Sequence, residues 1–334
     1  MFLLEVCGVA KNHIGESFNA TISFGLPKGQ KLAIAGETGS GKTTLLKMMA
    51  GLLEPTTGSV LFNQDQILMP SEQLIPGHPK IAFLSQYFEL RNNYRVEELL
   101  EMANKMEPAR ARHMYEICRI QHLLSRKTNQ ISGGEKQRIV LAQLLTTEPA
   151  LLLLDEPFSN LDKIHKQIMQ DVISDIATHF DTTCVLVSHD AADLLPWANR
   201  MLLIKEGAII RDDAPATIFY TPQNEYEAEI LGACNCINIG IFSGVKALIA
   251  EANDNQQLFI RPSQLSLIKP SGKGFEGTIV GVAFCGSHYL ITLQINGLTL
   301  QVASLDSDYT FGDRYEVCLK ENAKYFLLQG KPVG

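Results

Sequence analysis

The sequence lacks any long hydrophobic run, and none of its stretches approaches the roughly 18 apolar residues that a membrane-spanning helix requires. Residues 1–5 show neither the basic segment nor the apolar core of a secretory signal, so we expect no signal peptide. Positive charge is also scarce. With 29 Lys and Arg against 36 Asp and Glu, the formal net charge is −7, which argues against a dedicated nucleic-acid-binding protein. Because we expect neither a membrane-spanning helix nor a signal peptide, any role at a membrane has to go through a partner protein.

The seven cysteines show no metal-binding pattern. Cys234 and Cys236 are separated by one residue, but no second close pair of Cys or His flanks them at the spacing of a zinc site. Scattered cysteines in a chain without an export signal are expected to be reduced thiols. They therefore predict neither a zinc site nor a disulfide framework.

One segment determines the chemistry more closely than any other. Residues 36–43 read Gly-Glu-Thr-Gly-Ser-Gly-Lys-Thr, a complete phosphate-binding loop (P-loop), between an apolar run at 32–35 and a helical pattern that opens at Thr44. The glycines let backbone N–H groups turn toward a polyphosphate, and the helix N-terminus adds its positive dipole end. Lys42 would reach the β- and γ-phosphates, and the Thr43 hydroxyl would hold Mg²⁺. The predicted nucleotide-binding residues are Gly36, Glu37, Thr38, Gly39, Ser40, Gly41, Lys42, Thr43 and Thr44.

Up to about residue 213, short apolar runs alternate with amphipathic helices. The runs at 31–35, 81–85, 151–154 and 184–188 are typical of strands that are buried on both faces. This alternation predicts an α/β P-loop ATPase domain with a mostly parallel sheet over residues 1–235. The stretch 96–119 reads as continuously helical, and we interpret residues 87–135 as a helical insertion between two strands of the sheet.

The pattern changes beyond residue 236. Segments 289–295 and 298–302 alternate apolar and polar residues, and Asn296-Gly297 between them is a strong hairpin signal. We therefore predict a small all-β domain over residues 236–334, of the oligonucleotide/oligosaccharide-binding (OB) type, with residues 214–235 as the connection.

Two carboxylates end the apolar run 151–154. Asp155 is placed where a P-loop ATPase has its Mg²⁺-organising aspartate. Glu156 follows at once and is placed to orient the attacking water or to accept its proton. Together with the P-loop, the pair predicts hydrolysis of the bound nucleotide.

A second anion-binding signal precedes these carboxylates. Ile131-Ser132-Gly133-Gly134-Glu135 opens an apolar-periodic helix with a serine cap and free N–H groups. This segment, with the P-loop and Asp155-Glu156, resembles the ATP-binding-cassette (ABC) ATPases, in which the corresponding signature is Leu-Ser-Gly-Gly-Gln.

The resemblance assigns roles to further residues. Gln86 matches the glutamine that contacts Mg²⁺ and the attacking water, and His189 matches the histidine that touches the γ-phosphate. Asp162 matches the loop that crosses to a partner subunit. The aromatic residue that stacks on adenine falls on His13, with Phe18 as a second candidate. ATP and Mg²⁺ are the cofactors implied.

The resemblance also implies an assembly. In the family, two chains pair around two ATP molecules, so that Ser132, Gly133, Gly134 and Glu135 would face the ATP of the partner in a homodimer or in a pair with a related subunit. Residues 259–262 and 276–280 resemble the transport-associated β-domain found behind importer ATPases. These likenesses imply a peripheral subunit on the cytoplasmic face of the inner membrane. It would act on integral-membrane permease subunits and, indirectly, on an extracytoplasmic solute-binding protein.

Three functions remain open at this stage. The first is ATP-driven import of iron(III), an oxyanion, a polyamine or a sugar. The second is a soluble ABC ATPase of DNA repair or translation, although the segment between Gln86 and Ile131 is too short for the long coiled coils of repair types. The third, a non-catalytic regulatory protein, is disfavoured by Lys42, Glu156 and His189. The β-domain favours the importer, or acts only in dimerisation, and the sequence does not identify the solute.

Overall fold

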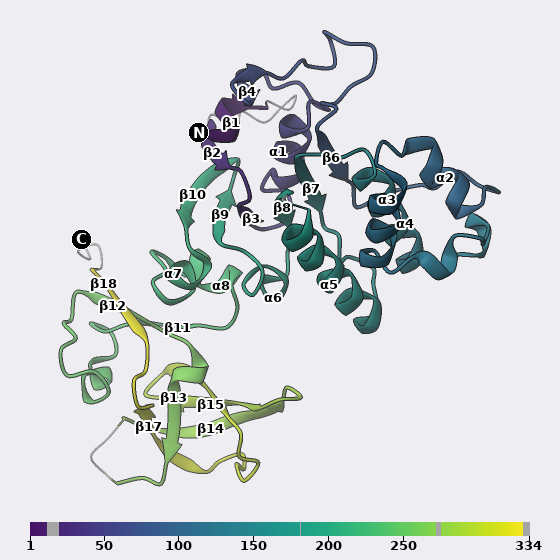
Figure 1. Ribbon diagram of the computed structural model, residues 1–334. Coiled ribbons are helices and arrows are strands. Elements are labelled where there is room, and N and C mark those ends of the chain that lie inside the picture. The colour runs from purple at the N-terminus through teal and green to yellow at the C-terminus, as the bar shows by residue number, and fades with distance from the viewer. Residues whose placement is uncertain (12–19, 181, 272–274, 330–334) are drawn as a thin grey trace. The chain divides into compact units, whose positions relative to one another are not determined.

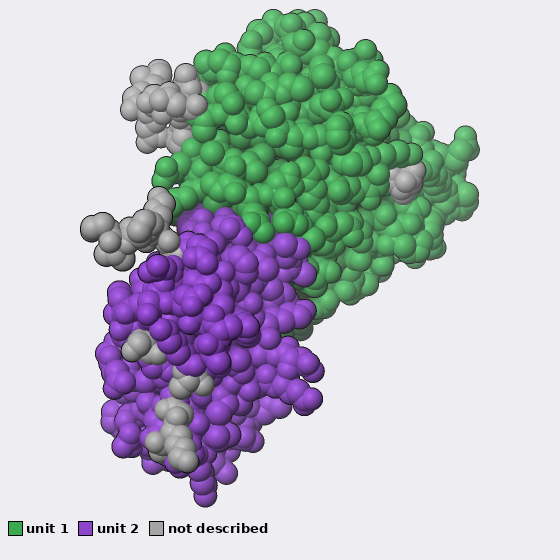
Figure 2. All heavy atoms as spheres, turned by 90° about the vertical axis from the view of Figure 1, so that its left-hand side faces the viewer, with its two compact units in different colours: residues 1–215 green, residues 216–334 purple. Residues whose placement is uncertain are grey.

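Five short strands run in parallel at the centre of the first part of the chain. The computed structural model describes residues 1–11, 20–180, 182–271 and 275–329, in two compact units, 1–215 and 216–334 (Figure 2). The central sheet has the order β10-β9-β3-β8-β7-β6 (Figure 1). Its strands are β3 (Lys31–Ala35), β6 (Ile81–Leu84), β7 (Leu151–Asp155), β8 (Thr183–Val187), β9 (Arg200–Lys205) and the antiparallel β10 (Ala208–Asp213). The predicted parallel sheet is confirmed.

The register of this sheet determines where the loops lie. Strand β3 pairs with both β8 and β9, and β7 pairs with both β8 and β6, all in parallel. The carboxyl ends of β3, β6, β7 and β8 therefore meet along one edge of the sheet, which is where ligands bind in open α/β folds. The P-loop follows β3, Gln86 follows β6, Asp155 ends β7 with Glu156 next to it, and His189 follows β8.

Helices surround the sheet. Helix α1 (Lys42–Met49) follows β3, and α5 (Lys163–His179) lies between β7 and β8 in sequence. The insertion holds α2 (Val96–Ala103), α3 (Pro108–Ile117) and the start of α4 (Gly133–Leu145), which gather beside the edge strand β6 (Figure 1). The prediction of one continuous helix over 96–119 is wrong. Proline disfavours a helical conformation in the residue before it, so the chain leaves α2 and begins α3 with Pro108 in the first turn.

An antiparallel sheet of order β2-β1-β4-β5 shares the core of this unit. Its strands are β1 (Phe2–Ala10), β2 (Ile22–Pro27), β4 (Thr57–Phe62) and β5 (Asp65–Gln66). A further short α-helix before β9 is α6 (Ala191–Leu194). Leu4, Val60 and Leu46 are fully buried in the same cluster as Leu32 and Ile34 of β3, so the two sheets and α1 form one hydrophobic core.

The second unit is built on two antiparallel sheets, of order β11-β12-β18 and β13-β17-β14-β15-β16. The strands are β11 (Asn235–Asn238), β12 (Gln256–Ile260), β13 (Leu265–Ile268), β14 (Phe275–Phe284), β15 (Tyr289–Ile295), β16 (Leu298–Ser304), β17 (Arg314–Leu319) and β18 (Tyr325–Gln329). The predicted hairpin is present, with Asn296 and Gly297 both at positive φ. The small all-β domain is therefore confirmed.

The connection predicted at 214–235 is itself structured. It contains α7 (Pro215–Tyr220) and α8 (Glu225–Ile230), and all of it after Pro215 falls within the second unit. Arg261, at the end of β12 and only 3% exposed, holds this segment in place. Its guanidinium donates to the carbonyls of Phe219, Ala228, Gly232 and Ala233, and it lies 4.0 Å from the centre of the Phe219 ring. The domain boundary predicted between residues 235 and 236 stays a prediction.

Candidate functional site

The P-loop leaves β3 and winds into the first turn of α1. Gly36 is required by close packing, since a Cβ there would lie 2.3 Å from the carbonyl oxygen of Ile204. Gly41 caps α1 with a left-handed backbone (φ 100°) and has no side chain, so the first N–H groups of the helix stay free. Such a helix start is a ready anion site.

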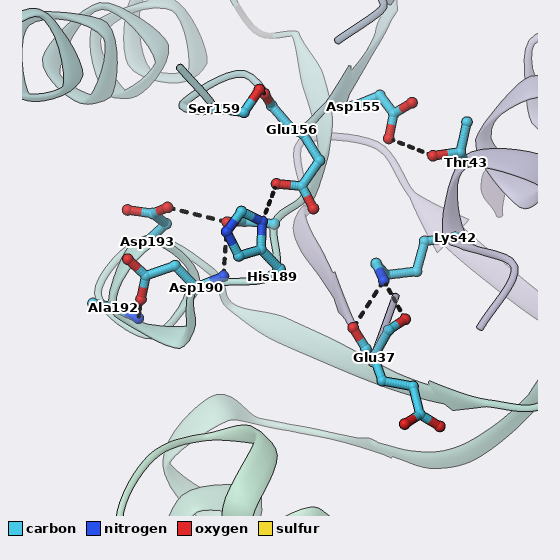
Figure 3. A network of polar contacts seen from close by, with 12 residues as sticks. Glu37, Lys42, Thr43, Asp155, Glu156, Ser159, His189, Asp190, Ala192 and Asp193 are labelled. Carbon is cyan, nitrogen blue, oxygen red and sulfur yellow. Dashed lines mark hydrogen bonds and ion pairs between the residues drawn. The ribbon is translucent and has the colours of Figure 1, made fainter. Parts of the chain in front are cut away.

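Lys42 closes this loop on itself. Its ammonium group donates to the backbone carbonyls of Gly36 and Glu37, each at 2.8 Å. Burial lowers the pKa of Lys42 below its usual value, although the carboxylates of Glu156, Asp155 and Glu37 act in the opposite direction. Figure 3 shows the ammonium group held between the two carbonyls. Among the described residues, the hydrogen-bond acceptors of this buried cation are two neutral carbonyls, and it is suited to exchange them for phosphate oxygens.

Thr43 and Asp155 form a second contact across the site. The Thr43 hydroxyl lies 3.0 Å from Oδ1 of Asp155, at the carboxyl end of β7 (Figure 3). Asp155 is only 2% exposed. Burial raises the pKa of Asp155, and the neighbouring Glu156 carboxylate adds to the rise, while the hydrogen bond from Thr43 opposes it. The desolvated carboxylate is thus stabilised by any cation that enters beside it.

These two oxygens fit Mg²⁺. A hydroxyl and a carboxylate are hard oxygen ligands, and protein sites for nucleotide-bound Mg²⁺ use one or two such groups together with phosphates and water. The described residues contain no group of three or more His, Cys, Asp or Glu side chains that could hold a metal ion unaided. The donor set at Thr43 and Asp155 therefore suits a metal that arrives with a polyphosphate.

Glu156 and His189 meet beyond this contact. Oε2 of Glu156 lies 2.8 Å from Nδ1 of His189, and because an ionised carboxylate only accepts, Nδ1 carries the proton (Figure 3). Glu156 has a left-handed backbone at φ 51°, a conformation that is uncommon for residues other than glycine and that is enriched at functional sites. The side chain of Glu156 is 13% exposed and that of His189 is 66% exposed. The carboxylate is thus partly shielded from water while the imidazole stays open to a ligand.

A set of polar side chains supports the loop that carries His189. Ser188 donates to Asp193 at 3.0 Å, and Lys166 of α5 bridges Asp190 and Asp193 at 2.9 and 2.7 Å. Burial opposes the charge on Lys166, but its hydrogen bonds to Asp193 and Asp190 outweigh this and raise its pKa. Beyond the acidic residues that follow His189, no pattern in the sequence indicates this support.

Most of the predicted site residues line one pocket of about 690 Å³. Its lining includes Gln86, Glu156 and His189 together with residues 38–45 of the P-loop and α1. It also includes residues that sequence reasoning missed: Val9, Ala10, Lys11, Ala20, Ile22, Met48 and Gly207. The ends of β1 and β2 give no sequence signal for this role, whereas Gly207, which follows β9 and donates its N–H to the Ser40 carbonyl, sits in a turn. His13 and Phe18 lie outside the described residues.

The signature segment lies apart from this pocket. In the described part of the chain, the pocket lining does not include Ser132, Gly133, Gly134, Glu135 or Asp162. Ser132 caps α4, where its hydroxyl accepts from the N–H of Glu135 and its own N–H donates to the Glu135 carboxylate at 2.9 Å. Burial disfavours that charge, but the bonds to Ser132 and the charges of Arg138 and Arg126 outweigh it and lower the pKa of Glu135. Asp162 caps α5.

The fold and this arrangement define a P-loop ATPase of the ABC type, and comparison with known proteins agrees. The family model "ABC transporter" matches residues 20–159, and the model "TOBE domain" matches residues 258–327. The chain therefore carries an ATP-binding domain of the ABC transporter type, with a TOBE domain behind it. Proteins of this family are ATPases that bind ATP and are coupled to transport, and this chain is one of them.

Individual relatives are named as ATP-binding proteins of import or transport. The chain is 29% identical to an Fe(3+) ions import ATP-binding protein of Rhodococcus jostii over 323 residues, 88% of each chain. It is 31% identical to the putrescine transport ATP-binding protein of Escherichia coli over 250 residues, 73% of this chain and 64% of the relative.

Solved structures share the fold. The ADP conformation of MJ1267, an ATP-binding cassette of an ABC transporter, matches with a TM-score of 0.57 at 21% identity and covers 66% of this chain and 96% of its own. The structure of cbiO1 from Clostridium perfringens, part of the ABC transporter complex cbiONQ, gives 0.56 at 22% identity and covers 75% of this chain and 96% of its own.

Proposed function

We propose that the chain is the ATP-hydrolysing subunit of an ABC importer, and that two copies close around two ATP molecules to drive a separate membrane permease. The observation that carries the proposal is the pocket that brings the P-loop, Gln86, Glu156 and His189 together at one sheet edge. These residues suffice to bind a triphosphate at the P-loop.

The chemistry follows from the side chains. Lys42 exchanges its two carbonyl partners for β- and γ-phosphate oxygens, and the α1 N-terminus receives the adjacent phosphate. Thr43, Asp155 and Gln86 are the residues we assign to Mg²⁺, which when bound neutralises charge on the β- and γ-phosphates. Glu156 orients the attacking water and accepts its proton, while His189 holds the Glu156 carboxylate and faces the γ-phosphate.

The site is incomplete in one chain, which supports the homodimer. Residues 132–135 offer a capped helix start with N–H groups, yet they lie outside the pocket that holds their own P-loop. In the proposed dimer they contact the γ-phosphate held by the partner, and Asp162 lies at the same junction. Because the loss of one preorganised electrostatic contact lowers turnover by about 10²–10³-fold, a lone chain is expected to be nearly inactive.

Transport requires partners of a defined kind. Among the described residues, no helix has the length and apolar character of a membrane span. We assign the solute path to integral-membrane permease subunits. We place this chain on the cytoplasmic face of the inner membrane, with an extracytoplasmic solute-binding protein acting indirectly and no nucleic acid involved. The names of the relatives favour iron(III) or a polyamine among the four solute classes.

The decisive experiment is affinity capture of the tagged chain from gently solubilised native membranes, followed by mass spectrometry. The expected result is a polytopic permease in the eluate, absent when an untagged strain is used, and its identity would narrow the solute class. Recovery from the soluble fraction alone, or together with DNA-repair or translation machinery, would contradict the importer and favour a soluble ABC ATPase.

A further inference from the structure

The first turn of α5 carries a histidine that no sequence motif assigned. One carboxylate oxygen of Asp162, the N-cap, accepts the backbone N–H groups of Ile164 and His165 at 3.0 and 2.9 Å. The other lies 2.6 Å from Nδ1 of the His165 ring. Asp162 thereby fixes both the start of the helix and the orientation of the imidazole.

The same ring packs against the signature segment. A Cβ built on Gly134 would lie 2.8 Å from Cδ2 of His165, 3.0 Å from Cγ and 3.1 Å from Cβ. Cδ2 and Cγ belong to the imidazole ring and Cβ joins the ring to the backbone, so these atoms cannot swing away while Asp162 holds Nδ1. The contact therefore sets how closely the Gly134 backbone approaches α5, and only glycine fits there.

A second contact joins the same two regions. Nε2 of the buried Gln137 donates to the carbonyl of Pro157 at 2.8 Å, just after Glu156. Gln137 and Gly134 are three residues apart and lie on one face of α4. The N-terminal turn of α4 is thus fixed at two points to the segment that runs from Glu156 to the start of α5.

We propose that His165 is a positioning residue for ATP hydrolysis: it fixes the N–H groups around Gly134 relative to Asp162, so that the two surfaces meeting the partner chain move as one. The inference rests on the proposed function, in which Gly134 faces the γ-phosphate of the partner. A misplacement of about 1 Å at such a contact can lower turnover about 10²-fold, so a side chain that touches no substrate can still control the rate.

Two variants of His165 separate its positioning role from general damage. In His165→Ala the ring and the Asp162 contact are both lost. In His165→Asn the side-chain amide occupies the positions of Nδ1 and Cδ2, and it can still donate to Asp162 and pack on Gly134. His179→Ala is the matched control, because His179 lies in the last turn of the same helix. Within the described residues, its contacts are with the Asp175 carbonyl of its own helix and with the ring of His113. Turnover, KM for ATP and the affinity for a fluorescent ATP analogue are measured on the full chain.

We expect His165→Ala to lower kcat by about tenfold or more through misplaced N–H groups. Nucleotide affinity, and the activities of His165→Asn and His179→Ala, should stay within about two- to threefold of wild type, as for substitutions away from a site. A His165→Ala chain that hydrolyses ATP like the wild type would overturn the inference. The same holds if the analogue affinity of His165→Ala falls as much as its kcat, or if His165→Asn is as impaired as the alanine variant. An inactive wild-type chain would instead remove the proposed function, and the inference with it.

Discussion

At Asp155 the chain keeps a carboxylate where burial works against its charge. Its folded-state pKa is raised, so its protonated form favours the folded state, and the ionised form present above that pKa destabilises the nucleotide-free protein. Thr43 offsets only part of this with one hydrogen bond. The stability lost here is regained when a cation binds.

Replacing this carboxylate with an amide should therefore raise stability and abolish function. We expect Asp155→Asn to raise Tm of the nucleotide-free chain at neutral pH, by about 2–4 °C for each kcal/mol gained in a unit of this size. The gain should shrink as the pH falls and the wild-type Asp155 becomes protonated. Magnesium-dependent turnover should be lost. Differential scanning calorimetry across pH, with and without ATP and Mg²⁺, tests this, and a variant less stable than wild type at neutral pH would contradict it.

Glu156 calls for a different substitution. Glu156→Gln keeps the length of the side chain and its contact with His189, but an amide cannot accept a proton from water. We expect turnover to fall by about 10²–10³-fold while ATP still binds, so that an ATP-bound dimer accumulates. Size-exclusion chromatography with light scattering measures this. A variant that remains monomeric at saturating ATP would show that bound ATP does not hold two chains together, which contradicts the proposed closure.

At the scale of elements, the packing of α5 on α4 can be tested by compensation. Gly134→Ala adds a methyl group against the His165 ring, and overpacking of this kind costs about 1–3 kcal/mol. Combining it with His165→Ala opens the space again. We expect the double variant to unfold at a higher urea concentration than Gly134→Ala alone. Additive losses in the double variant would mean that the ring and Gly134 do not share this contact.

Arg261 gives the second unit a similar test. Arg261→Met leaves four backbone carbonyls without their donor, each at a cost of about 1–3 kcal/mol unless water replaces it. Hydrogen exchange of the α8 amides should accelerate strongly, because the arginine binds this segment at four backbone carbonyls, besides the side-chain contact of Gln257 in β12 with Glu225 in α8. The matched control is Arg314→Met, which removes an exposed side chain that pairs with Glu276 at 3.4 Å. Equal exchange in the two variants would contradict the assigned role.

Local pattern predicted the buried elements closely and the partly exposed ones poorly. Strand β3 begins and ends where the apolar run 31–35 does, because a strand buried on both faces has no polar alternative. Helices α7 and α8 were not predicted, because each has only six residues and the arginine that holds them is distant in sequence. Motif spacing predicted the pocket at the P-loop, Gln86, Glu156 and His189, whereas its β1–β2 wall depends on packing that spacing does not encode.

At the scale of the whole molecule, the paired site predicts complementation. Lys42→Ala should inactivate the P-loop of its own chain, and Ser132→Arg should inactivate the signature that serves the partner. In a mixed dimer one of the two sites combines the intact P-loop with the intact signature. Two-fold symmetry makes the two sites of the wild-type dimer equivalent. If they act independently, random pairing of the two variants gives about a quarter of wild-type turnover. Phosphate release by the mixture, compared with each variant alone, measures this, and no recovery would favour sites completed within one chain.

The Arg261 contact also bears on how such proteins can be recombined. Residues 216–235 belong structurally with the β-sheets behind them, although they read as a connection in the sequence. A chimera joined at residue 235 would separate Arg261 from the carbonyls it binds and leave a buried charge without partners. A junction at residue 215 keeps arginine and carbonyls in one inherited piece. Exchange of β-domains between ATPases, in the laboratory or by gene fusion, is thus expected to tolerate the earlier junction better.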